Sequence, residues 1–183
     1  KIIISGNTRT LDKVIRRKIR VAEGDALNAS LIKRSRILVQ NLGHFGKVEL
    51  KQLDSKYGNN TYDIEIQVEE TSTGSFSLGG GFSSANGAQA TIGISENNLL
   101  GKSQKVRLNL QTSERQNRID FSFTEPYFLN RDVSFRTDAY TTVTQFRESN
   151  YDNERDGFSL GLGYNVGEYG RQRLGYTLEK RNI

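Results

Sequence analysis

Apolar and polar residues alternate along the second part of the chain. Between residues 74 and 183, seven segments carry apolar side chains at every second position, with polar or small residues between them and no helical interlude. The clearest run is Phe158, Leu160, Leu162, Tyr164 and Val166. A period of two places successive side chains on opposite faces of a β-strand. The pattern therefore predicts seven antiparallel strands, each with one apolar and one polar face.

Two properties of these strands favour a membrane barrel over a soluble sheet that is wet on one face. The predicted strands centre on residues 76–82, 88–95, 105–111, 119–124, 133–143, 158–166 and 174–179. Several approach the ~9–11 residues that a tilted strand needs to cross a bilayer. Their polar faces carry charges such as Arg107, Asp120, Arg136 and Asp138, which a water-filled lumen accommodates. Since closed barrels normally have an even number of strands, we expect the barrel to be incomplete in this chain.

The links between the predicted strands alternate in character. We expect polar, longer loops at 83–87, 112–118 and 147–156, and tighter turns at 97–102, 126–131 and 167–170. Short turns on one rim and longer loops on the other are typical of outer-membrane barrels. Tyr127, Phe128 and Tyr169 fall in the tighter turns, so we expect them in the aromatic girdle at the membrane interface.

Residues 1–70 follow a different pattern, strand–helix–helix–strand–strand. A β-branched strand over 1–5 precedes apolar residues at helical spacing (Leu11, Val14, Ile15, Ile19) in a helix that ends near Glu23. A second helix is expected from residues 28–30 to 41–43, with a stripe of Leu31, Leu38 and Leu42 beside Ser35, and two strands then alternate over 47–51 and 63–68 around a turn at 57–60. The predicted fold class is an α+β module (βααββ, residues 1–70) followed by antiparallel transmembrane β-barrel strands (residues 74–183).

Composition excludes several classes of function. The 26 Lys and Arg residues exceed the 21 Asp and Glu residues only modestly and form no dense basic cluster with aromatic support, so we expect no nucleic-acid partner. The absence of cysteine removes disulfides, thiolate metal sites and cysteine nucleophiles. His44 is the single histidine, without a partner for acid–base chemistry, and is expected to be a turn or packing residue. We expect no enzyme activity, metal or cofactor.

An ordered set of short motifs resembles one protein family along the whole chain. The motifs are Ile4-Ser5-Gly6-Asn7, Glu23-Gly24, Asn41-Leu42-Gly43-His44-Phe45, Thr73-Gly74-Ser75-Phe76, Asn97-Asn98-Leu99-Leu100-Gly101 and Thr124-Glu125-Pro126-Tyr127-Phe128. In this order they resemble the POTRA-barrel superfamily, and within it the BamA-like assembly factors. His44 departs from the pattern, since the family often has an aromatic residue there. The resemblance implies ATP-independent insertion of outer-membrane proteins, in the bacterial outer membrane, with the POTRA module in the periplasm.

The resemblance also implies roles for particular residues. The segment Ser75, Phe76, Ser77, Leu78, Gly79, Gly80, Gly81, Phe82 corresponds to the first strand of the barrel, which closes against the last one. Glycine weakens strand pairing, so this strand could open laterally and accept a substrate strand by β-augmentation. The alternative is that the three glycines relieve crowding or form a bulge. Glu23 matches a residue that contacts a BamD-like partner lipoprotein; from the sequence alone it is a helix end.

The implied partners are accessory outer-membrane lipoproteins, unfolded outer-membrane proteins and the lipid bilayer. A related POTRA-barrel transporter, of the two-partner secretion or TamA-like type, is the alternative function. A passive porin would have no reason to carry the N-terminal module.

Overall fold

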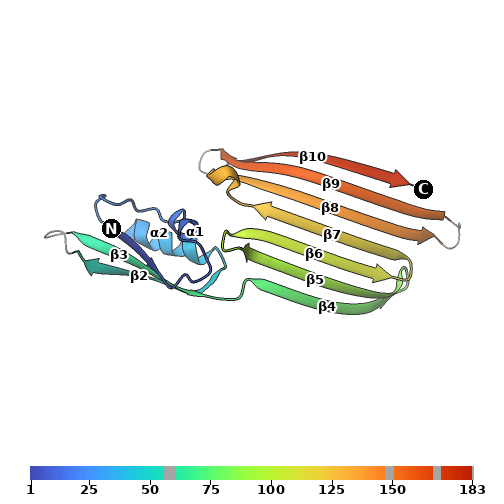
Figure 1. The fold of residues 1–183 in the computed structure, drawn as a ribbon, viewed down its shortest axis with the longest axis horizontal. Helices are drawn as coiled ribbons and strands as arrows, with labels where there is room; N and C mark the ends of the chain where they lie inside the picture. The colour runs from blue at the N-terminus through green and yellow to red at the C-terminus, as the bar shows by residue number, and fades with distance from the viewer. Residues whose placement is uncertain (56–60, 147–150, 167–169, 183) are drawn as a thin grey trace. The chain divides into compact units, whose positions relative to one another are not determined.

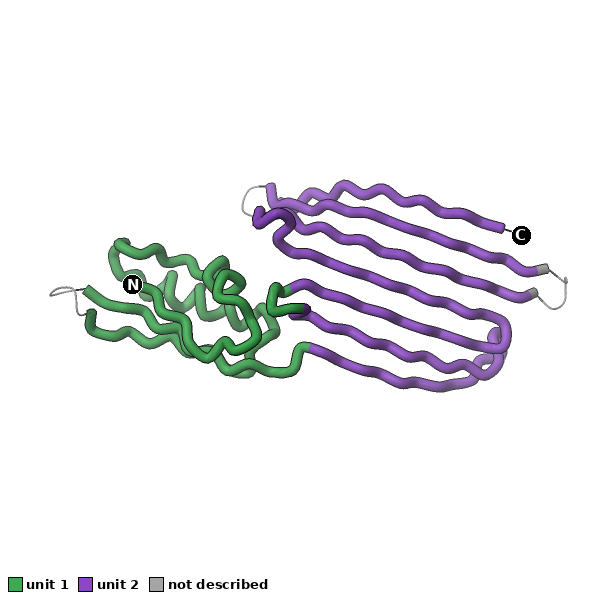
Figure 2. Tube along the Cα trace, in the orientation of Figure 1, with its two compact units in different colours: residues 1–73, 100–103 green, residues 74–99, 104–183 purple. Residues whose placement is uncertain are grey.

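The computed structural model describes residues 1–55, 61–146, 151–166 and 170–182 (Figure 1). The chain divides into two compact units (Figure 2). The first comprises Lys1–Thr73 together with Leu100–Ser103, and the second comprises Gly74–Leu99 and Gln104–Ile183. Within the described residues, no helix is both long and apolar enough to span a membrane.

The first unit is a three-stranded sheet packed against two helices. Its elements are β1 (Ile2–Ser5), α1 (Asp12–Arg16), α2 (Ala29–Gln40), β2 (Phe45–Asp54) and β3 (Tyr62–Glu70). The sheet order is β1-β3-β2, with β1 parallel and β2 antiparallel to the central β3. The buried core joins Ile15 and Val39 of the helices to strand residues Ile2, Phe45, Val48, Ile64, Ile66 and Val68. The predicted βααββ order is confirmed, and the turn expected at 57–60 lies outside the described residues.

Helix α2 begins where the sequence predicted, because the Asn28 side chain caps it by accepting the backbone N–H groups of Ser30 and Leu31. Its buried positions are Ser35 and Val39, with Leu31 and Leu38 only half-buried. The apolar stripe is thus centred closer to Val39 than predicted.

Helix α1 is shorter than predicted. It ends at Arg16 rather than near Glu23, and the N–H groups of Lys18 and Ile19 reach back only three residues, to Ile15 and Arg16. Isolated short helices are marginal, so tertiary packing decides where they end. Ile19 packs against the core although it lies beyond the end of the helix. Its spacing from Ile15 therefore resembles that of a helical residue.

The second unit is a single antiparallel sheet of seven strands, as predicted. The strands are β4 (Gly74–Ser83), β5 (Gly87–Leu99), β6 (Gln104–Ser113), β7 (Gln116–Glu125), β8 (Val133–Phe146), β9 (Tyr151–Val166) and β10 (Gly170–Asn182). Each pairs with its neighbours in chain order, from β4 at one edge to β10 at the other (Figure 1). The sheet is not closed among the described residues.

The strand registers separate the two faces completely in the middle of the sheet. One row of directly paired residues is apolar on every strand: Phe76, Ile94, Leu108, Phe121, Ala139, Phe158 and Leu178. The adjacent row, on the opposite face, is polar or small: Ser77, Gly93, Asn109, Asp120, Tyr140, Gly157 and Glu179. We call these the apolar row and the polar row. The alternation read from the sequence is therefore a property of the whole sheet.

The predicted contrast between long and short links is wrong. Among the described residues, the links expected to be long span 84–86 and 114–115, whereas those expected to be tight span 100–103 and 126–132. Residues 147–150 and 167–169 of the other two expected links lie outside the described residues. Strand β9 already begins at Tyr151, because Asp152 to Glu154 continue the ladder opposite Val143 to Gln145. Backbone pairing does not require apolar side chains, so the charged residues of this segment extend the strand instead of ending it.

Candidate functional site

Strand β4 forms one edge of the seven-stranded sheet. Within the described residues it pairs only with β5, in unbroken register from Gly74 opposite Glu96 to Ser83 opposite Gly87. The backbone N–H and C=O groups on its other side are directed away from β5. Such a row is a template for another strand.

The glycine triplet of β4 is not explained by local geometry. The register contains no bulge, and a Cβ at Gly79 would meet nothing within 4 Å. At Gly80 and Gly81 the nearest atoms, both from Gln89, would lie 3.6 and 3.5 Å from such a Cβ, which is ordinary contact. Crowding and bulge formation, the two structural alternatives for these glycines, therefore find no support in the β4–β5 pair.

The side chains of β4 are exposed on both faces of the strand. Phe76, Leu78 and Phe82 lie on the apolar face and are 68, 71 and 79% exposed. Ser75 and Ser77 lie on the polar face, where the Ser75 hydroxyl is 2.8 Å from that of Ser95. The strand thus combines an apolar face, a polar face and an edge without a partner among the described residues.

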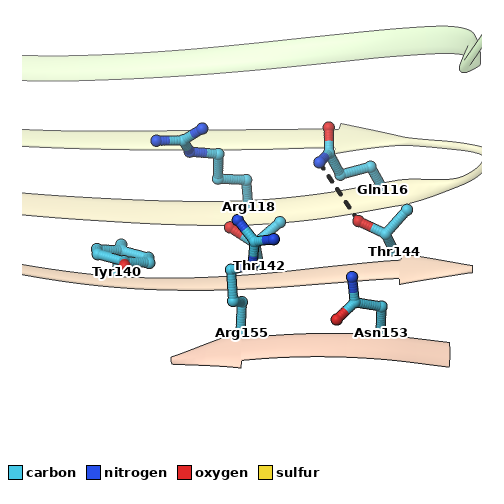
Figure 3. A pocket seen from close by; sticks show the side chains of 7 residues that line it. All are labelled: Gln116, Arg118, Tyr140, Thr142, Thr144, Asn153 and Arg155. Atoms are coloured by element: carbon cyan, nitrogen blue, oxygen red, sulfur yellow. Dashed lines mark hydrogen bonds between the residues drawn. The ribbon is translucent and has the colours of Figure 1, made fainter. Parts of the chain in front are cut away.

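The polar face of strands β7 to β9 has a hollow of about 360 Å³ that is lined by polar side chains (Figure 3). The hollow is lined by Gln116, Arg118, Tyr140, Thr142, Thr144, Asn153 and Arg155. Arg118 donates two hydrogen bonds to Asp120, with Nε at 2.8 Å, and the Gln116 amide donates to the Thr144 hydroxyl at 3.4 Å. Further along the same face Arg136 binds Asp138 in the same bidentate way. These pairs suit a wetted surface, and none forms a nucleophile–base arrangement.

No group of three or more potential metal-binding side chains of His, Cys, Asp or Glu occurs in the described part of the chain.

Glu23 lies in the loop between α1 and α2 rather than at a helix end. Its Oε1 accepts the backbone N–H of Ile2 at 2.9 Å and lies 4.0 Å from the Arg16 guanidinium. The side chain remains 55% exposed. Beside it is a cleft of about 360 Å³, lined by residues 1–2, 21–27, 55 and 61–64. Glu23 consequently combines an exposed charge with a role in holding the start of β1.

The predicted interface aromatics lie in the link between β7 and β8. The Phe128 ring, in the short 3-10 turn η1 (Phe128–Asn130), stacks on Phe135 with centroids 5.1 Å apart. Tyr127 is half-buried and its N–H donates to Glu125 at 2.9 Å. Tyr169 lies outside the described residues. Leu129, between Phe128 and Asn130, is 75% exposed with a φ of 53°, and it is not among the interface residues predicted from the sequence.

Glu70, at the end of β3, is a second residue whose role was not predicted from the sequence. Its carboxylate accepts the N–H groups of Arg9 and Thr10, the latter at 2.6 Å, and the Thr8 hydroxyl at 2.7 Å. Burial by itself raises the pKa of Glu70, but these hydrogen bonds outweigh it and hold the pKa at about 2. Nothing in the local sequence indicates this role, because its partners are about sixty positions away.

Known proteins match both units. The POTRA family model (surface antigen variable number repeat) matches residues 1–71, and the Omp85 superfamily domain model matches residues 98–183. The crystal structure of BamA from Haemophilus ducreyi lacking POTRA domains 1-3 matches all of this chain, with a TM-score of 0.82 and 28% identity. The chain is BamA-like. It combines a POTRA module with strands of an Omp85 barrel.

Curated relatives agree with this family. The outer membrane protein assembly factor BamA of Buchnera aphidicola is 27% identical over 100% of this BamA-like chain, and that of Neisseria meningitidis serogroup B is 29% identical over 100%. The chain spans 30% and 24% of those two proteins, and 35% of the solved H. ducreyi chain. CdiB from Acinetobacter baumannii has the same fold, with a TM-score of 0.62 at 15% identity.

Proposed function

We propose that this chain is part of an outer membrane protein assembly factor, and that β4 is its gate strand. In this proposal unfolded outer-membrane proteins add a strand to the free edge of β4 by β-augmentation, in the plane of the bilayer and without ATP. The POTRA module lies in the periplasm and the Omp85 strands in the bacterial outer membrane. The names of the relatives support assembly as the function, since the matched BamA proteins are assembly factors.

The observation that carries the gate is the combination of an edge strand with glycines that packing against β5 does not require. In lipid each unmet backbone group costs several kcal/mol, so the edge of β4 must find a partner. A glycine-rich strand pairs weakly and holds its register poorly, which keeps opening of that partner contact accessible. Gly79, Gly80 and Gly81 tolerate a Cβ sterically, so their effect on pairing strength can be tested without introducing clashes.

The test replaces the three glycines in the full-length protein by alanine. We expect the folded barrel to be retained and the rate of insertion of an unfolded barrel protein into vesicles to fall, because alanine is about 0.5–1 kcal/mol more favourable than glycine in a strand. A matched control is the pair Gly161→Ala and Gly175→Ala, whose added Cβ atoms would also meet only ordinary contacts. Assembly at the wild-type rate in the β4 variant would contradict the role of the glycines.

A disulfide between β4 and the final strand of the full-length barrel tests the gate itself. We expect it to abolish assembly and expect reductant to restore it. Full activity of the oxidised protein would show that the lateral opening is not the route.

We further propose that Glu23 docks a BamD-like accessory lipoprotein. Because its carboxylate also accepts the Ile2 N–H, the test must distinguish the effect of the charge on binding from the effect of this hydrogen bond on the fold. Glu23→Gln keeps a side-chain oxygen for that hydrogen bond and removes the charge, whereas Glu23→Lys removes both. We expect the Gln variant to keep the fold and to lose binding in a pull-down with the lipoprotein, with Asp25→Asn in the same exposed loop as the control. Unchanged binding of the Gln variant would exclude a role for this charge.

A further inference from the structure

His44 contacts the chain on both sides of the hairpin formed by β4 and β5. It is 1% exposed and lies between α2 and β2. Its backbone carbonyl accepts the N–H of Thr71 at 3.0 Å, and its ring Nε2 lies within hydrogen-bonding distance of Ser103 Oγ, at 2.7 Å. Thr71 precedes β4 by three residues, and Ser103 ends the turn that follows β5. Both partners belong to the first unit.

The turn of residues 100–103 has an unusual backbone that its surroundings hold in place. Leu100, Gly101 and Ser103 all have left-handed φ angles, of 54, 68 and 62°. Non-glycine residues seldom adopt such angles, and such angles persist where neighbouring contacts determine them. Here Leu11 donates its N–H to the Gly101 carbonyl at 2.9 Å, and Ser103 is only 6% exposed.

The segment of residues 9–10, on which this turn packs, leaves no room for a side chain at residue 101. A Cβ on Gly101 would collide with the carbonyl of Arg9. Glu70 holds this segment by accepting the N–H groups of Arg9 and Thr10. The Arg9 guanidinium also donates a hydrogen bond to the Thr71 carbonyl at 3.0 Å. The turn and residue 71 are therefore bound to one connected network of hydrogen bonds.

We propose that His44 is a positioning residue that ties both ends of the β4–β5 hairpin to the POTRA module. The backbone of His44 holds the segment that leads into β4, and its ring holds the turn that leaves β5. A role of His44 in assembly rests on the proposed function of β4 as the gate strand. The contacts of His44 with Thr71 and Ser103, which we call the tie, do not depend on that function. Residues 71 and 103, at the two ends of the hairpin, are thereby held to one side chain and backbone of the first unit.

Three variants of the full-length protein in lipid vesicles test the contact between the His44 ring and the Ser103 hydroxyl. His44→Phe keeps an aromatic ring and removes the ring nitrogens, Ser103→Ala removes the hydroxyl, and His44→Gln places an amide nitrogen close to the position of Nε2. Lys102, exposed within the turn, supplies a trypsin site that reports opening of the tie. We expect about tenfold faster cleavage after Lys102 in the Phe and Ala variants, since loss of one buried hydrogen bond is worth about 1.4 kcal/mol. Cleavage in the Gln variant should return towards the wild-type rate.

The double variant and an assembly measurement complete the test. His44→Phe with Ser103→Ala should be cleaved no faster than either single variant, and insertion of an unfolded barrel protein should slow in each of them and recover with His44→Gln. Wild-type cleavage in both single variants would overturn the tie, and faster cleavage with unchanged insertion would overturn the positioning role. Cleavage requires no assembly activity, so a failure of the proposed function would leave the cleavage difference in place.

Discussion

The hydroxyl of Tyr140 donates a hydrogen bond to the carboxylate of Glu179 across an intervening strand. Tyr140 is on β8, Glu179 on β10, and Gly157 of β9 is paired directly with both. The Tyr140 ring occupies the space that a side chain at position 157 would need, so a Cβ there would collide with it. Glycine at this position of the polar row leaves the space that the Tyr140 ring occupies in this arrangement.

Replacing Gly157 by alanine should destabilise the barrel. Overpacking of this kind typically costs about 1–3 kcal/mol, because the Tyr140 ring must move and lose its bond to Glu179. Urea unfolding in vesicles, followed by mobility on cold SDS gels, measures the effect. Gly161→Ala on the same strand is the control: its Cβ would lie 3.8 Å from the nearest atom, and it should be neutral or slightly stabilising. Equal midpoints for the two variants would contradict the packing role of Gly157.

The two parities of the sheet should differ in their tolerance of charge. Phe121 belongs to the apolar row and faces lipid in the proposed barrel, whereas Ser122 lies on the opposite face. Phe121→Arg should cost roughly 2–4 kcal/mol near the bilayer midplane, and Ser122→Arg much less. Refolding yield and urea midpoints in lipid compare the two variants. Similar losses at both positions would refute the membrane-facing assignment.

The stability of the POTRA module should depend on pH through Glu70. Its folded pKa of about 2 lies below the ordinary value of 4.5, so its contribution is present above pH 4.5 and is lost as the pH falls towards 2. The contribution is roughly 3 kcal/mol, at about 1.4 kcal/mol for each unit of pKa. Urea midpoints of the module at pH 6, 4 and 3 should fall for the wild type and fall less for Glu70→Gln. Glu69→Gln, at the exposed neighbouring position, should retain the wild-type slope, and identical slopes in all three proteins would exclude this role of Glu70.

The POTRA module should fold without the barrel strands. All of its buried core residues lie within residues 1–70, on both helices and all three strands. A protein of residues 1–70 should therefore protect the amides of Ile64, Ile66 and Val68 in hydrogen exchange. Complete exchange within minutes would show that the core needs the rest of the chain.

The strands were predictable because period-two alternation is local and strong. Each strand of the second unit follows from its own residues, and antiparallel pairing of neighbours follows from short links. The strand ends were not predictable, because whether Asp152 to Glu154 continue β9 depends on the partners that β8 offers. The prediction of where α1 ends was wrong for a similar reason. Ile19 has the spacing of a helical residue but packs against the core beyond the end of the helix.

The candidate site was predictable in part. The glycine triplet was evident in the sequence, but only the register and the space around each glycine show that the β4–β5 pair has neither a bulge nor crowding there. The sequence marked His44 as a turn or packing residue, and its burial agrees with packing. Its partners Thr71 and Ser103 are 27 and 59 positions away, so their contacts emerge only from the fold.

The distribution of glycine between the two faces has a consequence for curvature. On the polar face the sheet carries Gly79, Gly81, Gly93, Gly157, Gly161, Gly163 and Gly175, whereas the apolar row carries large side chains on nearly every strand. When a sheet bends, side chains on the concave side converge and those on the convex side spread apart. Glycines, which have a hydrogen atom in place of a side chain, resist that convergence least. Their positions on the polar face therefore favour bending of the sheet towards that face. In the proposed barrel, a curl in this sense places the charges inside and the Phe and Leu side chains outside.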